Sequence, residues 1–323
     1  MTPANASTQS TFIVPPIYPL IDTHTHFDAV VFDNDRALLA QQAYVQGVRH
    51  LLLVGYLHQY FERMYETEQR LKTQWQSATI VADGQNLSHT EMHIALGLHP
   101  FYIEQHNEYH LKDMAKMIAK RRPLAIGEIG LDTFTKAMKE PDIFAKQVRF
   151  FTAQLDMAVA HQLPVLLHIR KAHAEVLAIL KAHEYDAHKL GGIAHSFSGG
   201  AQEAKAFVSL GFKLGVTGQI TNPNAKKLRR AIQAAVASHG IACLVIETDC
   251  PDMTPIMCQT ANATSVPDHF IHDSTVHDRN VPANLPWILL SLSELLNVSP
   301  NVLAEQLWHN SCSALQTAWF YPQ

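Results

Sequence analysis

Two histidines spaced two positions apart, His24 and His26, follow the first apolar segment of the chain. Residues i and i+2 of a β-strand point to the same side, so both imidazoles could reach one metal ion at the end of a strand. Neutral imidazole is the commonest protein ligand for borderline divalent ions. The chain holds 20 histidines in 323 residues, so roughly one such pair is expected by chance and the pair is weak evidence alone.

Four more candidate ligands each stand at the end of a separate short apolar segment. They are two carboxylates and two imidazoles: Glu128, His168, His195 and Asp249. Each segment is apolar on both faces and closed by polar residues, which is typical of a buried parallel strand. Burying six such side chains in one place without a partner would be costly. Together with the first two histidines, they therefore predict a metal site.

The elements that would position these residues alternate along the chain. Eight strands are predicted, at 18–24, 50–55, 94–99, 123–128, 164–168, 191–195, 212–216 and 243–249. Helical periodicity is clearest at 36–46, 144–162, 172–183, 201–210 and 225–238. This alternation predicts an α/β fold, and eight strands favour a distorted (β/α)₈ TIM barrel with C-terminal helices, whose site lies at the C-terminal strand ends. The alternative, an open doubly wound sheet, lacks a glycine-rich phosphate loop after its first strand.

Composition indicates one globular domain. Residues 1–17 are polar and proline-containing without Lys or Arg, which predicts a flexible tail rather than a signal peptide. Residues 18–323 are predicted to form a single barrel domain in which 252–278 is an insertion. No apolar run approaches the roughly 20 residues of a membrane span, and the four cysteines show no Cys-x-x-Cys spacing. We therefore expect a cytoplasmic monomer without a membrane partner. The net charge of −4 indicates that any contact with a polyanion is local.

Five motifs resemble those of the TatD-type metal-dependent deoxyribonucleases, which belong with the amidohydrolase-like barrels. The motifs lie at 24–26, 127–132, 168–170, 195–199 and 248–251, in the order that the family has them. The likeness extends from about Ile21 to Ala314. One departure follows Asp132, where aromatic residues are expected and the chain has Thr133 and Phe134.

The resemblance implies a site for two divalent ions, Mg²⁺, Mn²⁺ or Zn²⁺. One ion would be held by His24, His26, Glu128 and Asp249. The other would be held by His168 and His195, with Glu128 as the bridge. Two such ions can clamp the attacking and leaving oxygens of a phosphodiester, and can lower the pKa of a bound water from 15.7 to about 7. Asp249 is the candidate general base, with Glu128 beside it in the catalytic centre, and the imidazoles favour Zn²⁺ or Mn²⁺ over Mg²⁺.

The substrate that the resemblance implies is DNA, hydrolysed at phosphodiester bonds from a 3′ end. Two alternatives stay open: hydrolysis of an ester or amide, as by an aminoacyl-tRNA deacylase, lactonase or amidase, and a metal-stabilised scaffold that only binds a partner. His99 and Arg170 are predicted to contact substrate or phosphate, against a capping role and a structural salt bridge respectively. Glu247 either orients a ligand histidine or forms a structural ion pair. His106 is expected on an exposed loop or helix.

Overall fold

Eight parallel strands form the centre of the molecule. The computed structural model describes residues 17–78, 89–259 and 279–322, and in these residues the strands are hydrogen-bonded in chain order from β1 to β8. The strands are β1 (Leu20–Thr25), β2 (Val48–Val54), β3 (Glu91–Leu96), β4 (Ala125–Asp132), β5 (Val165–Arg170), β6 (Ile193–Ala194), β7 (Lys213–Val216) and β8 (Leu244–Ile246). β8 returns to β1, since the backbone N of Asp249 donates to His24 O at 2.9 Å. The fold is therefore the predicted (β/α)₈ TIM barrel.

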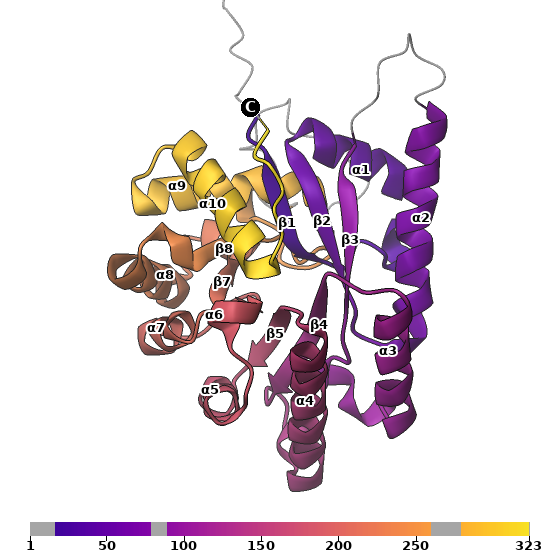
Figure 1. Ribbon diagram of the computed structural model, residues 1–323. Coiled ribbons are helices and arrows are strands. Elements are labelled where there is room, and N and C mark those ends of the chain that lie inside the picture. Colours follow the sequence, from indigo (N-terminus) through magenta and orange to yellow (C-terminus); the bar gives the residue numbers. More distant parts are fainter. Residues whose placement is uncertain (1–16, 79–88, 260–278, 323) are drawn as a thin grey trace, which may run out of the picture.

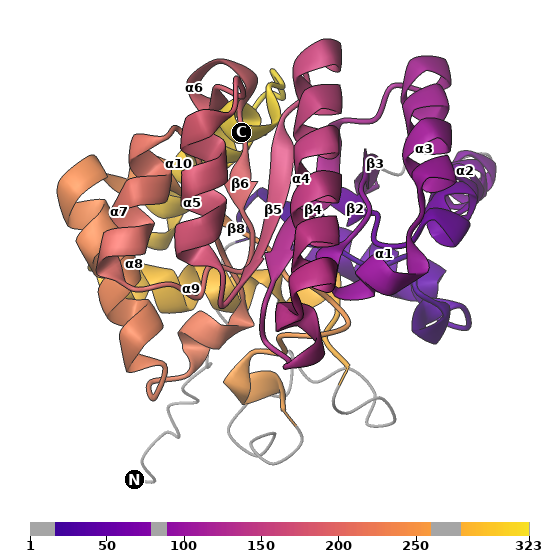
Figure 2. The same cartoon turned by 90° about the horizontal axis from the view of Figure 1, so that it is seen from below.

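Helices surround the strands on the outside of the barrel (Figures 1 and 2). They are α1 (Arg36–Val45), α2 (Phe61–Ala78), α3 (Glu108–Lys120), α4 (Pro141–His161), α5 (His173–Ala182), α6 (Ala187–Leu190), α7 (Ala201–Ser209), α8 (Lys226–His239), α9 (Leu285–Leu296) and α10 (Pro300–Leu315). The five predicted helices agree with α1, α4, α5, α7 and α8 to within a few residues. The C-terminal helices α9 and α10 are also present, as predicted.

Apolar side chains fill the barrel and the space between strands and helices. Inside the barrel, Leu52, Ala95, Leu166 and Val245 belong to one buried cluster, which supports the site from below. A larger cluster packs the outer faces of the strands against the helices. The barrel is distorted, as expected, because β6 has only two residues whereas β4 has eight, all of them buried.

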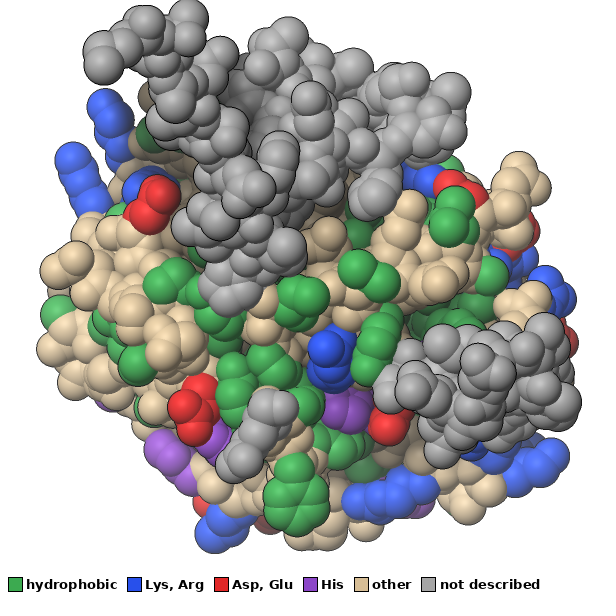
Figure 3. All heavy atoms as spheres, turned by 90° about the horizontal axis from the view of Figure 1, so that it is seen from above, with side chains coloured by type: hydrophobic (Ala, Val, Ile, Leu, Met, Phe, Trp, Pro, Cys, Tyr) green, Lys and Arg blue, Asp and Glu red, His purple; other side chains and the backbone are tan. Residues whose placement is uncertain are grey.

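On the face shown in Figure 3, hydrophobic side chains gather near the centre together with basic, acidic and histidine side chains, and further Lys and Arg side chains lie toward the edges. No single helix of the described residues is long and apolar enough to cross a membrane; the pair 282–296 and 300–315 passes by length and composition together, but is bent by 111°. Nearly all of the predicted tail 1–17, and residues 260–278 of the predicted insertion, lie outside the described residues.

Candidate metal centre

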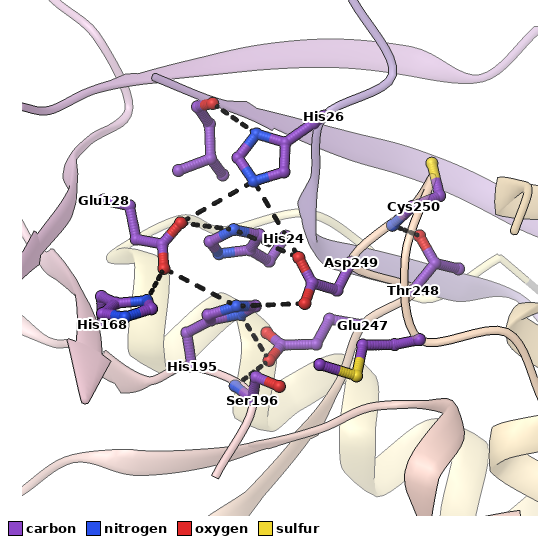
Figure 4. A network of polar contacts seen from close by, with 12 residues as sticks. His24, His26, Glu128, His168, His195, Ser196, Glu247, Thr248, Asp249 and Cys250 are labelled. Atoms are coloured by element: carbon purple, nitrogen blue, oxygen red, sulfur yellow. Dashed lines mark hydrogen bonds and ion pairs between the residues drawn. The ribbon is translucent and has the colours of Figure 1, made fainter. Parts of the chain in front are cut away.

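All six predicted metal ligands converge at the C-terminal ends of the strands. They come from five strands or the residues just after them: His24, His26, Glu128, His168, His195 and Asp249 (Figure 4). Five of them line a cleft of about 680 Å³, and the ring of His24 lies beneath it, fully buried. The strand arrangement therefore gathers side chains that lie up to 225 residues apart in the sequence at one end of the barrel.

Glu128 lies at the centre of this group. Its carboxylate, on a residue only 2% exposed, faces five imidazoles. The distances are 2.7 Å to His168 Nδ1, 3.3 Å to His24 Nε2, 3.3 Å to His99 Nε2, 3.7 Å to His26 Nε2 and 3.8 Å to His195 Nε2. Burial alone would raise the pKa of Glu128, but the surrounding histidines hold it well below its usual range. An ionised carboxylate with ligands on both sides has the placement that a bridge between two ions requires.

His24 and His26 face the Oε2 side of Glu128. The ring of His24 is fully buried, and within the described chain neither of its nitrogens makes a hydrogen bond. Its Nε2 and that of His26 lie 3.8 and 3.9 Å from Asp249 Oδ1. The other nitrogen of His26, Nδ1, lies 3.0 Å from Val54 O, which turns Nε2 toward the carboxylates. A buried ring with unpaired nitrogens beside two carboxylates fits a bound cation, because buried polar atoms otherwise find partners.

His168 faces the Oε1 side of Glu128 and is held by a second carboxylate. Its Nε2 lies 3.1 Å from Asp132 Oδ2. Burial would lower the pKa of His168, but hydrogen bonds to Asp132 and Glu128 raise it to about 9. The sequence analysis did not single out Asp132 as a site residue. The available signal is its spacing, because residues i and i+4 of a strand share a side and Asp132 follows Glu128 by four in β4.

His195 is oriented by Glu247. The Nδ1 of His195 lies 2.8 Å from Glu247 Oε1, and its Nε2 points to Asp249 Oδ2 at 3.5 Å. Glu247 is fully buried and accepts hydrogen bonds from Ser196 N at 2.6 Å and Thr23 Oγ1 at 3.0 Å. Burial would lower the pKa of His195, but the carboxylates of Glu247 and Asp249 raise it well above its usual value. Of the two roles left open for Glu247, these contacts favour orientation of a ligand histidine.

The donors form overlapping sets of three. The sets whose atoms lie within 4.8 Å of one another at this end of the barrel are His24–His26–Glu128, His24–His195–Asp249 and His99–Glu128–His168. His195 thus shares a set with His24 and Asp249, whereas the resemblance implies that it pairs with His168. The division of ligands between two ions stays a prediction. Glu128 belongs to two of the sets, which is consistent with its predicted bridging position.

The two predicted substrate contacts also lie at the cleft. His99 Nδ1 accepts a hydrogen bond from Phe101 N at 2.9 Å, so His99 caps the following turn while its Nε2 faces Glu128. Burial lowers the pKa of His99 to about 4 although Glu128 opposes this. The guanidinium of Arg170 lies 3.7 Å from the ring centroid of Phe134. Both His99 and Arg170 line the cleft, together with the aromatic side chains of Tyr56, Phe101 and Tyr102.

The expectation that His106 is exposed is wrong. His106 is only 2% exposed, because its ring packs beside Phe150 and its Nε2 lies 3.2 Å from His99 O. Lys146 Nζ also donates to His106 O at 2.7 Å. The buried ring therefore supports the loop that carries His99.

Comparisons with known proteins agree with this architecture. The model of the family described as TatD related DNase matches residues 21–316. The uncharacterized metal-dependent hydrolase YjjV of Escherichia coli (strain K12) is 35% identical over 235 residues, which are 72% of this chain and 80% of the relative. The 3′-5′ ssDNA/RNA exonuclease TatD of Pantoea sp. (strain At-9b) is 29% identical over 216 residues, 67% of this chain and 74% of the relative.

A solved structure is similar as well. The crystal structure of YjjV from Escherichia coli K12 superposes with a TM-score of 0.72 at 29% identity, covering 93% of this chain and 98% of that one. A barrel with histidines and carboxylates converging at its C-terminal strand ends defines the class of metal-dependent hydrolases to which these relatives belong. The chain belongs to the TatD family of that class, as the resemblance of its motifs predicts.

Proposed function

We propose that the protein hydrolyses phosphodiester bonds of single-stranded or frayed DNA from a 3′ end, using two divalent ions. The observation that carries this proposal is the central position of Glu128, with imidazoles on both sides of its carboxylate. Relatives named 3′-5′ ssDNA/RNA exonuclease support the choice of substrate. The donor set, four imidazoles and two carboxylates, suits Zn²⁺ or Mn²⁺ better than Mg²⁺.

The residues of the chain would divide the work between them. Ions held by the six ligands would polarise the phosphate and lower the pKa of an attacking water. Asp249 lines the cleft, where its carboxylate could accept a proton. It is held in the ionised form because His195 lowers its pKa, although burial would raise it. His195 is held in place by Glu247, and His168 by Asp132. These contacts fix the direction of the ligand nitrogens before substrate arrives.

The cleft walls suit a nucleotide. Tyr56, Phe101 and Tyr102 offer aromatic faces on which bases can stack, a contact worth about 1–3 kcal/mol per base and tolerant of sequence. Arg170 lies at the same cleft, and a guanidinium matches the geometry of a phosphate group. The Phe134 ring under Arg170 limits the directions in which its guanidinium can point. A nucleic acid held by a small number of local contacts of this kind is compatible with the net charge of −4.

The test compares substrates in parallel. Metal-free protein is reloaded with Mn²⁺, Zn²⁺ or Mg²⁺ and incubated with single-stranded oligonucleotides labelled at either end, with aminoacyl-tRNA and with simple esters. We expect release of mononucleotides from the 3′ end, and its loss in Glu128→Gln. Turnover of esters or aminoacyl-tRNA without nucleotide release would assign the site to carbonyl chemistry. Full metal loading without turnover of any substrate would favour the alternative that the protein is a metal-stabilised scaffold that only binds a partner.

A further inference from the structure

A second group of metal-ligating side chains lies at the other end of the barrel. His50 belongs to β2, and Glu91 and His93 belong to β3. His50 is paired with Glu91 across the two parallel strands, and Leu52 with His93. Because residues i and i+2 share a face, His50 lies on the same face as Leu52, which is part of the cluster inside the barrel. The three side chains therefore lie at the N-terminal end of the barrel, away from Glu128.

Their donor atoms lie close together. The Nδ1 of His50 is 3.1 Å from the Nε2 of His93 and 3.6 Å from Glu91 Oε2, and all three donors lie within 4.8 Å of one another. Two nitrogens bound to one zinc ion at about 2.0–2.1 Å in a tetrahedral arrangement are roughly 3.3 Å apart, close to the spacing between His50 and His93. Glu91 has a side chain that is 60% exposed, so solvent reaches the group from one side.

The C-terminal segment of the chain covers the two imidazoles. The ring of Trp319 stacks on His50 with centroids 4.1 Å apart at 9°, and on His93 at 4.5 Å and 30°. Trp319 is itself held, since its carbonyl accepts a hydrogen bond from Trp308 Nε1 at 2.9 Å. Figure 1 shows the C-terminal residues beside β1, and Figure 2 shows this end of the chain opposite the loop that follows β8.

We propose that His50, Glu91 and His93 form an additional metal site for a zinc-like divalent ion, separate from the centre around Glu128. Two imidazoles and one carboxylate are a donor set that zinc uses, with a fourth position left for water. A bound ion would tie β2 to β3 beneath Trp319, at the end of such barrels that serves stability rather than catalysis.

The test uses the full chain and two readouts that do not depend on activity. Chelator-treated protein is reloaded with Zn²⁺, freed of excess metal and analysed for zinc per chain. We expect His93→Gln to hold about one ion fewer than the parent protein. His58→Gln is the matched control, because His58 also pairs with a carboxylate, Asp113 Oδ2 at 2.8 Å, but lies outside the group. It should hold as much zinc as the parent protein.

Tryptophan fluorescence during titration with Co²⁺ gives the second readout, because a paramagnetic ion quenches the fluorescence of an indole that contacts its ligands. We expect saturable quenching in the parent protein that is lost in His93→Gln and reduced in Trp319→Phe, because Trp308 also contacts His50, with ring centroids 5.3 Å apart. Glu91→Gln changes an exposed side chain, so it should fold and should weaken Co²⁺ binding at least tenfold. Equal zinc contents in the parent protein and His93→Gln, or quenching that persists unchanged in His93→Gln, would overturn the proposal. The spacing of His50 and His93 would then reflect a hydrogen bond between two neutral rings.

Discussion

Glu247 offers the sharpest test of how the metal centre is held, because it touches a predicted ligand without being one. Replacing it with Gln keeps the size of the side chain and one acceptor oxygen for Ser196 N, at the position that faces His195 Nδ1. The new amide nitrogen would face Thr23 Oγ1, which also donates to Ile246 O. Glu247→Gln should therefore fold normally while losing the negative charge behind the ring of His195.

The magnitude follows from the 2.8 Å contact between His195 Nδ1 and Glu247 Oε1. Replacing the carboxylate behind a ligand histidine typically costs 10- to 100-fold in metal affinity or activity. That is about 1.4–2.7 kcal/mol. The charge of Glu247 also raises the pKa of His195, so that protons compete with metal in the parent protein. The loss of metal affinity in Glu247→Gln, relative to the parent protein, should therefore become smaller as the pH falls.

The assay is a competition titration of Mn²⁺ or Zn²⁺ against a chromophoric chelator from pH 6 to 8.5, with nucleotide release measured on the same samples. Asp22→Asn is the control, because Asp22 is equally buried but accepts its hydrogen bonds from Thr248 and from the backbone of His24. Burial raises the pKa of Asp22 to about 7, so its charge is already partly lost near neutral pH. Metal affinity in Glu247→Gln within threefold of the parent protein at every pH would refute the reasoning.

Three further predictions concern the cleft and its support. Asp249→Asn keeps a donor oxygen but removes the base, so turnover should fall about 10²–10⁴-fold while metal occupancy is largely kept; recovery of activity with excess Mn²⁺ would make Asp249 a ligand only. Arg170→Lys keeps the charge but loses the planar fork and the stacking on Phe134, so KM for oligonucleotides should rise by about tenfold with kcat little changed, as steady-state kinetics would show. His106 has a pKa lowered by burial to about 4, below the 6.5 of an unfolded chain, so it favours folding at neutral pH and loses that contribution as the pH falls through 6.5 toward 4. His106→Gln should lack this loss, and denaturant unfolding at pH 7.5 and 4 should show the difference, up to about 3 kcal/mol.

The sequence predicted the fold and the gathering of the ligands because both depend on local patterns. Short apolar segments ending in His, Asp or Glu mark buried parallel strands, and a closed barrel brings all their C-terminal ends to one place. The exact ends of the strands were harder to predict from the sequence. β6 ends at Ala194 and β8 at Ile246, before His195 and Asp249, and positive φ follows at Ser196 (43°) and Asp249 (56°). Neither is a glycine, so the sequence carries no sign of these turns.

Contacts between distant elements explain most of what the sequence did not show. His106 looks like a surface residue, and only the packing of Phe150 from α4 reveals that it is buried. The helix α3, which was not predicted, does carry a signal: Asn107 caps it, and its buried residues Leu111, Met114 and Ile118 have helical spacing. The group of His50, Glu91 and His93 depends on the register of two strands, and a shift by one residue would separate its donors.

The most direct test of the central claim is an anomalous diffraction map of crystals soaked in Mn²⁺, recorded at the manganese edge. At the centre around Glu128 we expect two peaks, both within about 2.0–2.2 Å of a carboxylate oxygen of Glu128. One lies on the side of His24 and His26, and the other on the side of His168. A map in which no ion contacts Glu128, or in which a single ion is bound by histidines alone, would contradict it.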